Sequence, residues 1–158
     1  MELKTKVNAE PGKQEIVITR EFNLPVHLLF KAHTEPEIVE QWMGNKVLKM
    51  ESRHHGSYQF ETRDPQGNVV FRANGTIHEC IPNQRITRTF QMENTHFAVQ
   101  LDFYEFEELT PGTSKLTIHM VFKSVMYRDQ LLQMPFEKGL NMAHDRLQEV
   151  VVNLINYP

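Results

Sequence analysis

Residues 136–156 read FEKGLNMAHDRLQEVVVNLIN, and this stretch decides the fold that the remaining sequence predicts. Apolar side chains recur in it at steps of three and four, the spacing that lines one face of an α-helix. They are Phe136, Leu140, Ala143, Leu147, Val150, Val151 and Leu154. A long helix with one apolar stripe needs an apolar surface to cover, and the rest of the chain must supply that surface.

The middle of the chain offers that surface as a series of alternating strands. We expect strands at residues 13–22, 47–51, 56–63, 69–81, 85–92, 97–107 and 116–123. Tight turns such as Asp64–Gly67 and Thr110–Thr113 join neighbouring strands, which predicts antiparallel pairing. Gly75, inside a long strand, predicts a bulge or bend.

Three short helices complete the pattern. Two follow the first strand, one from Val26 and one from Pro36 to Gly44, and another is expected near residues 127–134. The fold class is therefore α+β, a helix-grip fold in which a curved antiparallel sheet wraps the long C-terminal helix. We expect one domain over residues 1–158, with a core of about 13–156.

The composition of the chain argues against several classes of function. The chain has 158 residues and a formal net charge of -3, which argues against a general nucleic-acid binder. No stretch approaches the roughly 20 apolar residues of a membrane span, and residues 1–12 lack the apolar run of a secretory signal. The single cysteine, Cys80, suits a reducing compartment. These observations predict a cytoplasmic protein.

Large, adaptable side chains gather on the strand faces expected to meet the helix. They are Tyr58, Phe60, Phe71, Phe90, Met92, Phe103 and Met120, facing Phe136, Leu140, Met142 and Leu147. Phe103 is placed there because Phe97, Val99 and Leu101 share its parity, whereas Phe106 has the opposite parity. The row predicts either an apolar pocket or a filled core, since sequence cannot measure the volume between sheet and helix.

Three other side chains bear on such a pocket. Trp42 either flanks the pocket's mouth, together with mobile loops around Asp64 and Asn94, or pins a helix to the sheet. An inward Arg88 would need an acidic partner or an anionic ligand, and a strand end that returns it to solvent is the simpler expectation. His144 lies beside the inner stripe and could titrate there, although a solvent-facing flank is simpler.

Catalytic and metal motifs are not visible. The sequence has no Gly-x-Ser-x-Gly elbow, no phosphate-binding glycine loop and no His-Glu-x-x-His pair. With one cysteine and scattered histidines, no structural zinc site is expected. We therefore expect no catalytic residues, no metal and no cofactor.

The order and spacing of several short segments resemble those of a known family. The segments are Arg20–Pro25 (REFNLP), Thr34–Glu37 (TEPE), Gln41–Gly44 (QWMG), Gly56–Phe60 (GSYQF), Gly75 with Ile77 leading to Pro82, Arg85–Ile86, Thr113–Thr117 (TSKLT), and Gly139, Leu147 and Leu154 in the last helix. Together they resemble the START-like, birch-allergen-like (SRPBCC) superfamily. Within it, the chain is most similar to the C-terminal domain family of activator of Hsp90 ATPase homologue 1. It departs from the commonest pattern at Met43 and at His54–His55.

The resemblance implies a cavity between the sheet's concave face and the long helix. The resulting hypothesis is a non-catalytic domain that binds a small hydrophobic or lipid-like ligand. Its expected ligand-binding residues are Trp42, Tyr58, Phe60, Phe71, Arg88, Phe90, Phe103, Met120, Leu140, Met142 and His144. Two alternatives stay open: a protein-interaction module, such as a chaperone regulator or a homodimer, and a small cyclase-like enzyme using Arg88 and His144.

Overall fold

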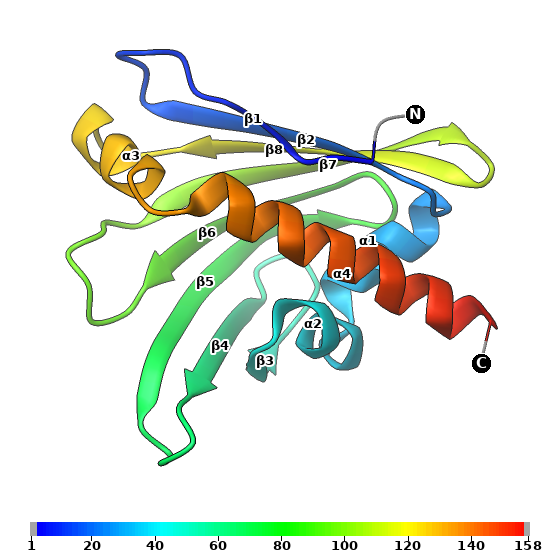
Figure 1. Ribbon diagram of the computed structural model, residues 1–158, viewed down its shortest axis with the longest axis horizontal. Helices are drawn as coiled ribbons and strands as arrows, with labels where there is room; N and C mark the ends of the chain where they lie inside the picture. Colours follow the sequence, from blue (N-terminus) through cyan, green and yellow to red (C-terminus); the bar gives the residue numbers. More distant parts are fainter. Residues whose placement is uncertain (1–2, 157–158) are drawn as a thin grey trace.

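A strongly bent sheet of eight antiparallel strands holds one long helix across its concave face (Figure 1). The computed structural model describes residues 3–156. The strands are β1 (Lys6–Asn8), β2 (Glu15–Phe22), β3 (Lys46–Met50), β4 (Ser57–Arg63), β5 (Val69–Ile81), β6 (Arg85–Met92), β7 (Gln100–Thr110) and β8 (Thr113–Val121). They lie in the order β1-β2-β8-β7-β6-β5-β4-β3.

The four helices are α1 (Val26–Thr34), α2 (Pro36–Met43), α3 (Val125–Leu132) and α4 (Phe136–Asn156). Pro36 begins α2, and Gly44 ends it in the left-handed conformation at φ 72, as the sequence predicted. Together, α4 and the curved sheet make the α+β helix-grip fold that the sequence predicted. None of the described helices is long and apolar enough to cross a membrane.

Strand β7 differs from its prediction in both limits and orientation. It begins at Gln100 rather than Phe97, and its buried row is Gln100, Asp102 and Phe106. Antiparallel pairing places Asp102 opposite Met120 and Phe106 opposite Leu116, so the apolar row of β8 sets which face of β7 turns inward. Leu101, and with it Phe103, therefore lies on the outer face. The expected inward row was wrong for Val99, Leu101 and Phe103, whereas Phe97, which precedes the strand, packs against the core.

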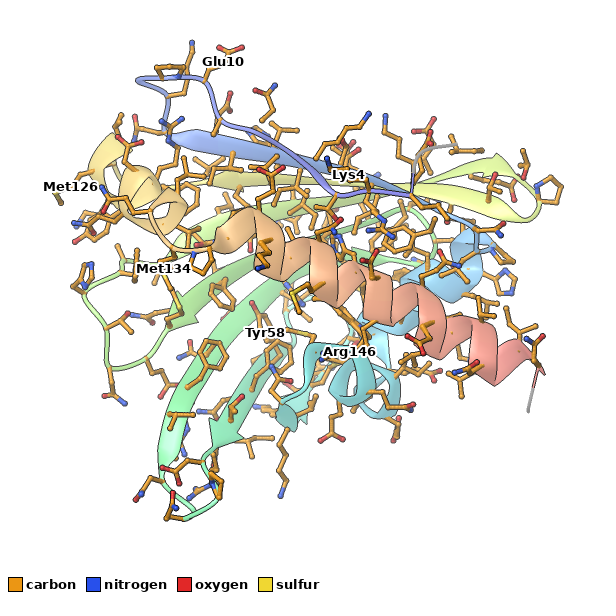
Figure 2. All side chains as sticks on the ribbon, in the orientation of Figure 1. Lys4, Glu10, Tyr58, Met126, Met134 and Arg146 are labelled. Atoms are coloured by element: carbon orange, nitrogen blue, oxygen red, sulfur yellow. The ribbon has the colours of Figure 1, made fainter. Side chains whose placement is uncertain are left out.

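Gly75 does not itself form the expected bulge, because the register of β5 shifts between Ile77 and Glu79. Gly75 lies opposite Tyr58 of β4, and a Cβ added there would come within 2.5 Å of the Tyr58 ring and 2.0 Å of the Thr89 carbonyl oxygen. The Tyr58 hydroxyl donates a hydrogen bond to that same oxygen. Figure 2 shows Tyr58 on the face of the sheet that α4 covers. Glycine is thus required for close packing of an aromatic ring.

The apolar stripe of α4 faces the concave side of the sheet and packs against α1 and α2. Leu147 and Val151 are buried, and Leu140 is half-buried. Leu154 was expected on the same stripe but is 39% exposed, because it lies near the end of α4, where it lines a surface pocket with Leu28 of α1 and Ile38 of α2. The helix is also held by charge, since Nη2 of buried Arg20 on β2 lies 2.9 Å from Oδ1 of Asp145.

Candidate functional site

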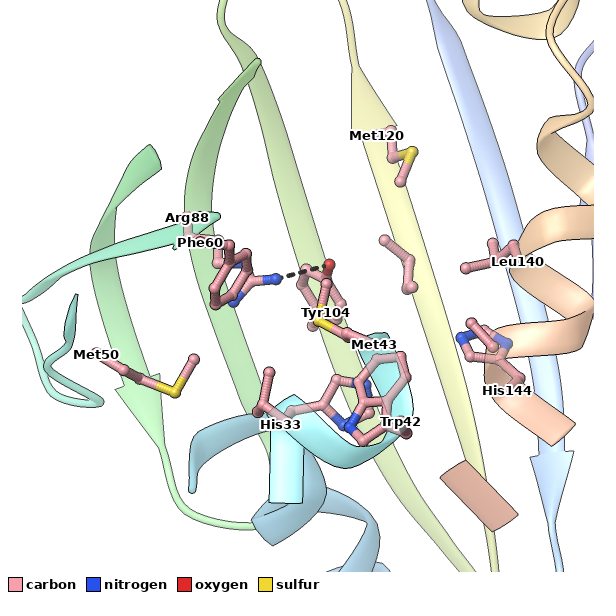
Figure 3. Close-up of a pocket in the computed structure, with 13 residues that line it drawn as sticks. His33, Trp42, Met43, Met50, Phe60, Arg88, Tyr104, Met120, Leu140 and His144 are labelled. Carbon is pink, nitrogen blue, oxygen red and sulfur yellow. Dashed lines mark hydrogen bonds between the residues drawn. The ribbon is translucent and has the colours of Figure 1, made fainter. Parts of the chain in front are cut away.

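A cavity of about 170 Å³ lies between the concave face of the sheet and helices α1, α2 and α4 (Figure 3). Its walls are mostly apolar, with a few polar atoms from Arg88, Tyr104 and two histidines. The lining residues are His33, Val39, Trp42, Met43, Met50, Phe60, Arg88, Tyr104, Ile118, Met120, Leu140, Ala143 and His144.

Six of the eleven residues expected to bind a ligand line this cavity: Trp42, Phe60, Arg88, Met120, Leu140 and His144. The other five do not. Tyr58 is buried next to the wall, where its ring contacts Arg88, and Phe71 and Phe90 pack against the core. Met142 points away from the sheet and is 55% exposed. Phe103 lies beside His119 on the outer face, for the pairing reason given above.

Seven lining residues were missed, and three of them had a signal in the sequence. Ile118 shares the alternating row of Met120, and Ala143 belongs to the same helical stripe as Leu140. Tyr104 has the parity of Phe106, which the expected register of β7 turned outward. His33, Val39, Met43 and Met50 come from α1, α2 and β3, whose approach to the sheet is a tertiary feature. The loops around Asp64 and Asn94, expected at the mouth, supply no lining residue.

Arg88 is the charged group of the cavity wall. It is only 8% exposed, so the expectation that it returns to solvent was wrong. Its guanidinium carbon lies 4.5 Å from the centre of the Tyr58 ring and 4.7 Å from that of Tyr104, and Nη2 donates to the Tyr104 hydroxyl at 3.1 Å. Nε is buried and makes no hydrogen bond within residues 3–156. Aromatic faces thus stabilise a cation that lacks a full set of acceptors.

Asp102 is the nearest acidic neighbour of Arg88 in the sheet, because the two residues pair across β6 and β7. The carboxyl is buried and accepts a hydrogen bond at 2.9 Å from the Gln100 side chain. Burial raises the pKa of Asp102 to about 6, against the lowering effects of Gln100 and Arg88. No ion pair joins it to Arg88; indeed, Arg88 has none with any described carboxylate.

Two buried histidines flank Trp42 on the other side of the cavity. Nδ1 of His33 lies 2.9 Å from the Leu29 carbonyl oxygen and therefore carries the proton, because that oxygen can only accept. Nδ1 of His144 lies 2.7 Å from the Thr5 hydroxyl. Burial lowers the pKa of His33 to about 4 and that of His144 to about 3, so both rings are neutral at pH 7. The solvent-facing flank expected for His144 was wrong.

Trp42 is held in place by its own hydrogen bond. The indole Nε1 donates to the Ala32 carbonyl oxygen at 2.7 Å, and the ring is almost entirely buried. It therefore joins α2 to α1 and forms part of the cavity wall at the same time. Within residues 3–156, no group of three or more His, Cys, Asp or Glu side chains converges on a possible metal position. The chemistry that this site offers is burial of an apolar body beside one cation and a few neutral hydrogen-bonding groups.

Comparison with known proteins places this chain in a family. The family model described as "Activator of Hsp90 ATPase homolog 1-like protein" matches residues 23–152, so the chain belongs to that family. This confirms the resemblance seen in the sequence. No curated protein matches the chain.

Solved structures of low sequence identity share the fold. Ms6760 from Mycobacterium smegmatis has a TM-score of 0.81 at 20% identity, over 92% of this chain and 95% of that one. A protein from Rhodobacter sphaeroides has a TM-score of 0.84 at 15% identity, over 94% and 98%. NE0264 from Nitrosomonas europaea has a TM-score of 0.76 at 21% identity, over 91% and 97%. At these identities the likeness concerns the fold alone.

Proposed function

We propose that this chain is a non-catalytic binding domain that takes up one small, largely apolar molecule in the cavity between the sheet and α4. The observation that carries the proposal is the cavity itself, about 170 Å³ and walled mainly by carbon and sulfur atoms. An apolar cavity of about 150 Å³ in another protein is large enough to bind benzene. A ligand of one ring or a short branched chain matches that size, and burial of its surface drives binding.

The polar groups of the wall support binding rather than proton-transfer chemistry. His33 and His144 have pKa values of about 4 and 3, too low for an acid or base that must change protonation near neutral pH. Methionines at positions 43, 50 and 120 add flexible surface that adjusts to the shape of a ligand. We place this activity in the cytoplasm, in keeping with the single unpaired Cys80.

Trp42 makes the proposal testable without a label, because it is the only tryptophan and it lines the cavity. Toluene and a panel of small metabolites should change its fluorescence, and native mass spectrometry should show one bound molecule per chain. Ala143→Phe, which fills the cavity from α4, should weaken binding more than tenfold. Met142→Phe adds bulk on the exposed side of the same helix and should bind normally. Equal binding by both variants would place the ligand elsewhere and refute the proposal.

A chaperone-regulating role and a homodimer stay predictions for this chain. The family's name refers to an Hsp90 activator, and the role would require direct contact with the chaperone rather than the cavity. A pull-down together with an ATPase assay tests the chaperone-regulating role. Recovery of the chaperone with faster ATP hydrolysis would favour this role, and the absence of both results would rule it out.

A further inference from the structure

The wall of an otherwise apolar cavity holds a permanent positive charge without an anion bound to it. Arg88 is 8% exposed and lines the cavity, and no described carboxylate forms an ion pair with it. A guanidinium remains protonated at any physiological pH, so burial cannot neutralise it as it would a lysine. Asp102, on the neighbouring strand, attracts this charge electrostatically but forms neither an ion pair nor a hydrogen bond with it, so the guanidinium keeps donors for a further acceptor.

We infer that the molecule bound in this cavity is a small carboxylic acid, held as its anion by Arg88 with its hydrocarbon part against the apolar wall. This inference rests on the proposed function, because it names the class of ligand that the same cavity takes. It adds a requirement that an apolar cavity alone would not impose, namely one negative charge on the ligand.

Two neighbouring donors favour a carboxylate at this point. Arg88 presents a planar set of N–H groups: Nη2 donates to Tyr104, Nη1 donates to no described residue, and Nε is buried behind them. The Tyr104 oxygen accepts a hydrogen bond from Nη2, so its own O–H is left to donate, and no described residue accepts from it. Guanidinium and hydroxyl groups side by side suit the two oxygens of a carboxylate. Figure 3 shows this pair facing the apolar side chains of Met120 and Leu140 across the cavity.

The volume of the cavity limits the hydrocarbon part of the ligand. A cavity of about 170 Å³ accommodates a single ring with a carboxylate, and is too small for a fatty acid chain unless the walls move. Phe60, Met50 and Ile118 supply apolar contacts for that ring. Benzoate is therefore a suitable probe, with benzamide as its uncharged isostere and toluene as the purely apolar member of the set.

Because of Asp102, the affinity for a carboxylate should depend on pH in a defined direction. The Asp102 carboxylate is the cross-strand neighbour of Arg88, so an ionised Asp102 and a bound carboxylate repel each other. The other ionisable groups packed around Arg88 stay neutral near pH 6, since Tyr58, Tyr104 and Cys80 have raised pKa values and His33 has a lowered one. Asp102, with a pKa of about 6, therefore gains a proton when the anion binds, and binding tightens as pH falls from 8 to 6.

The test compares the three probes by Trp42 fluorescence and by NMR titration. At pH 6, the natural protein should bind benzoate at least about tenfold more tightly than benzamide, the scale of a charge-assisted pair. Arg88→Met keeps an apolar stem and should abolish this preference while retaining toluene. Arg85→Met is the matched control on the same strand, because Arg85 bonds Glu79 outside the cavity at 2.8 Å. It should leave all three affinities unchanged.

Two further variants keep the inference testable if Arg88→Met does not fold. Asp102→Asn should tighten benzoate binding several-fold at pH 8 and flatten its pH dependence. Tyr104→Phe should weaken benzoate several-fold and leave toluene unchanged. If benzamide and toluene bind while benzoate binds no better, or if the preference for benzoate survives in Arg88→Met, the carboxylate inference is wrong and the cavity proposal stands. If none of the three probes binds to the natural protein, both fail.

Discussion

Burial shifts the pKa values of His33, Asp102 and His144. His33 and His144 are neutral because the protein removes them from water and gives each ring nitrogen Nδ1 a hydrogen-bond partner, Leu29 or Thr5. The pKa of Asp102 moves in the opposite direction, upward, because burial favours the neutral form of a carboxylic acid as well. These three residues therefore make folding stability depend on pH in a way that can be calculated.

Acidification from pH 7 to pH 5 should lower the free energy of unfolding. The unfolded histidines, with pKa values near 6.5, bind protons in this range, whereas the folded ones do not. Each histidine thus costs about 2 kcal/mol of stability at pH 5. Asp102 acts oppositely, because its folded form takes up the proton first, and it restores about 1 kcal/mol. Urea unfolding at both pH values should show a net loss of about 3 kcal/mol.

The Asp102→Asn variant provides the control for this pH dependence. It removes the opposing group, so its stability loss between pH 7 and pH 5 should exceed that of the natural protein by about 1 kcal/mol. A free energy of unfolding that stays constant or rises on acidification would show that the two histidines are not buried in neutral form.

At the scale of the element, α4 is the helix whose packing closes the cavity. Its residues contribute unequally, because the sheet covers only part of its length. Leu147 is fully buried in the core, whereas Leu154 lines a surface pocket beside α1 and α2 and is 39% exposed. The same residue type thus occurs on one helix in two different environments.

Replacing each of these leucines by alanine measures that difference. Leu147→Ala should lower the free energy of unfolding by about 2–5 kcal/mol, since it removes buried carbon and leaves a cavity. Leu154→Ala should cost about 1 kcal/mol or less, because that side chain is already 39% exposed. Chemical denaturation of the two variants is a sufficient measurement. Similar costs would mean that the end of α4 is covered in solution, for example by a second copy of the chain.

For the whole molecule, Arg20 connects three parts of the chain that are distant in sequence. From β2, its Nη1 donates to the Asn141 side chain at 3.2 Å and reaches the Thr5 hydroxyl at 3.5 Å, while Nη2 pairs with Asp145. Asn141 in turn accepts from the Thr5 backbone N–H at 2.9 Å. The N-terminal segment, the sheet and α4 therefore share one buried hydrogen-bond network.

Arg20→Met should lower the free energy of unfolding by about 2 kcal/mol, because it leaves the buried Thr5 hydroxyl and the half-buried Asn141 amide with fewer partners. Asp145→Asn removes the negative charge beside Arg20 but keeps an oxygen acceptor at that place, so it should cost less than Arg20→Met. Thermal and urea unfolding compare the two. Equal and small effects would show that α4 is held by apolar packing alone.

The sequence by itself determined the architecture, because periodic apolar residues report which face of each element is buried. The stripe containing Leu147, the alternation through Met120 and the stop at Gly44 each have one simple solution in a folded chain. The family resemblance followed from the spacing of these same signals. For this reason the fold, and six of the residues that line the cavity, were predictable without coordinates.

Only the tertiary structure decided which polar side chains are buried at the site. Strand β7 was read one residue out of phase, since a polar row of Gln100, Asp102 and Tyr104 resembles an exposed face, and only pairing with β8 turned it inward. Arg88 and His144 were expected in solvent for the same reason: local pattern penalises polar groups in a core. Their burial depends on partners such as Tyr58, Tyr104 and Thr5, which are remote in sequence and become neighbours only when the chain folds.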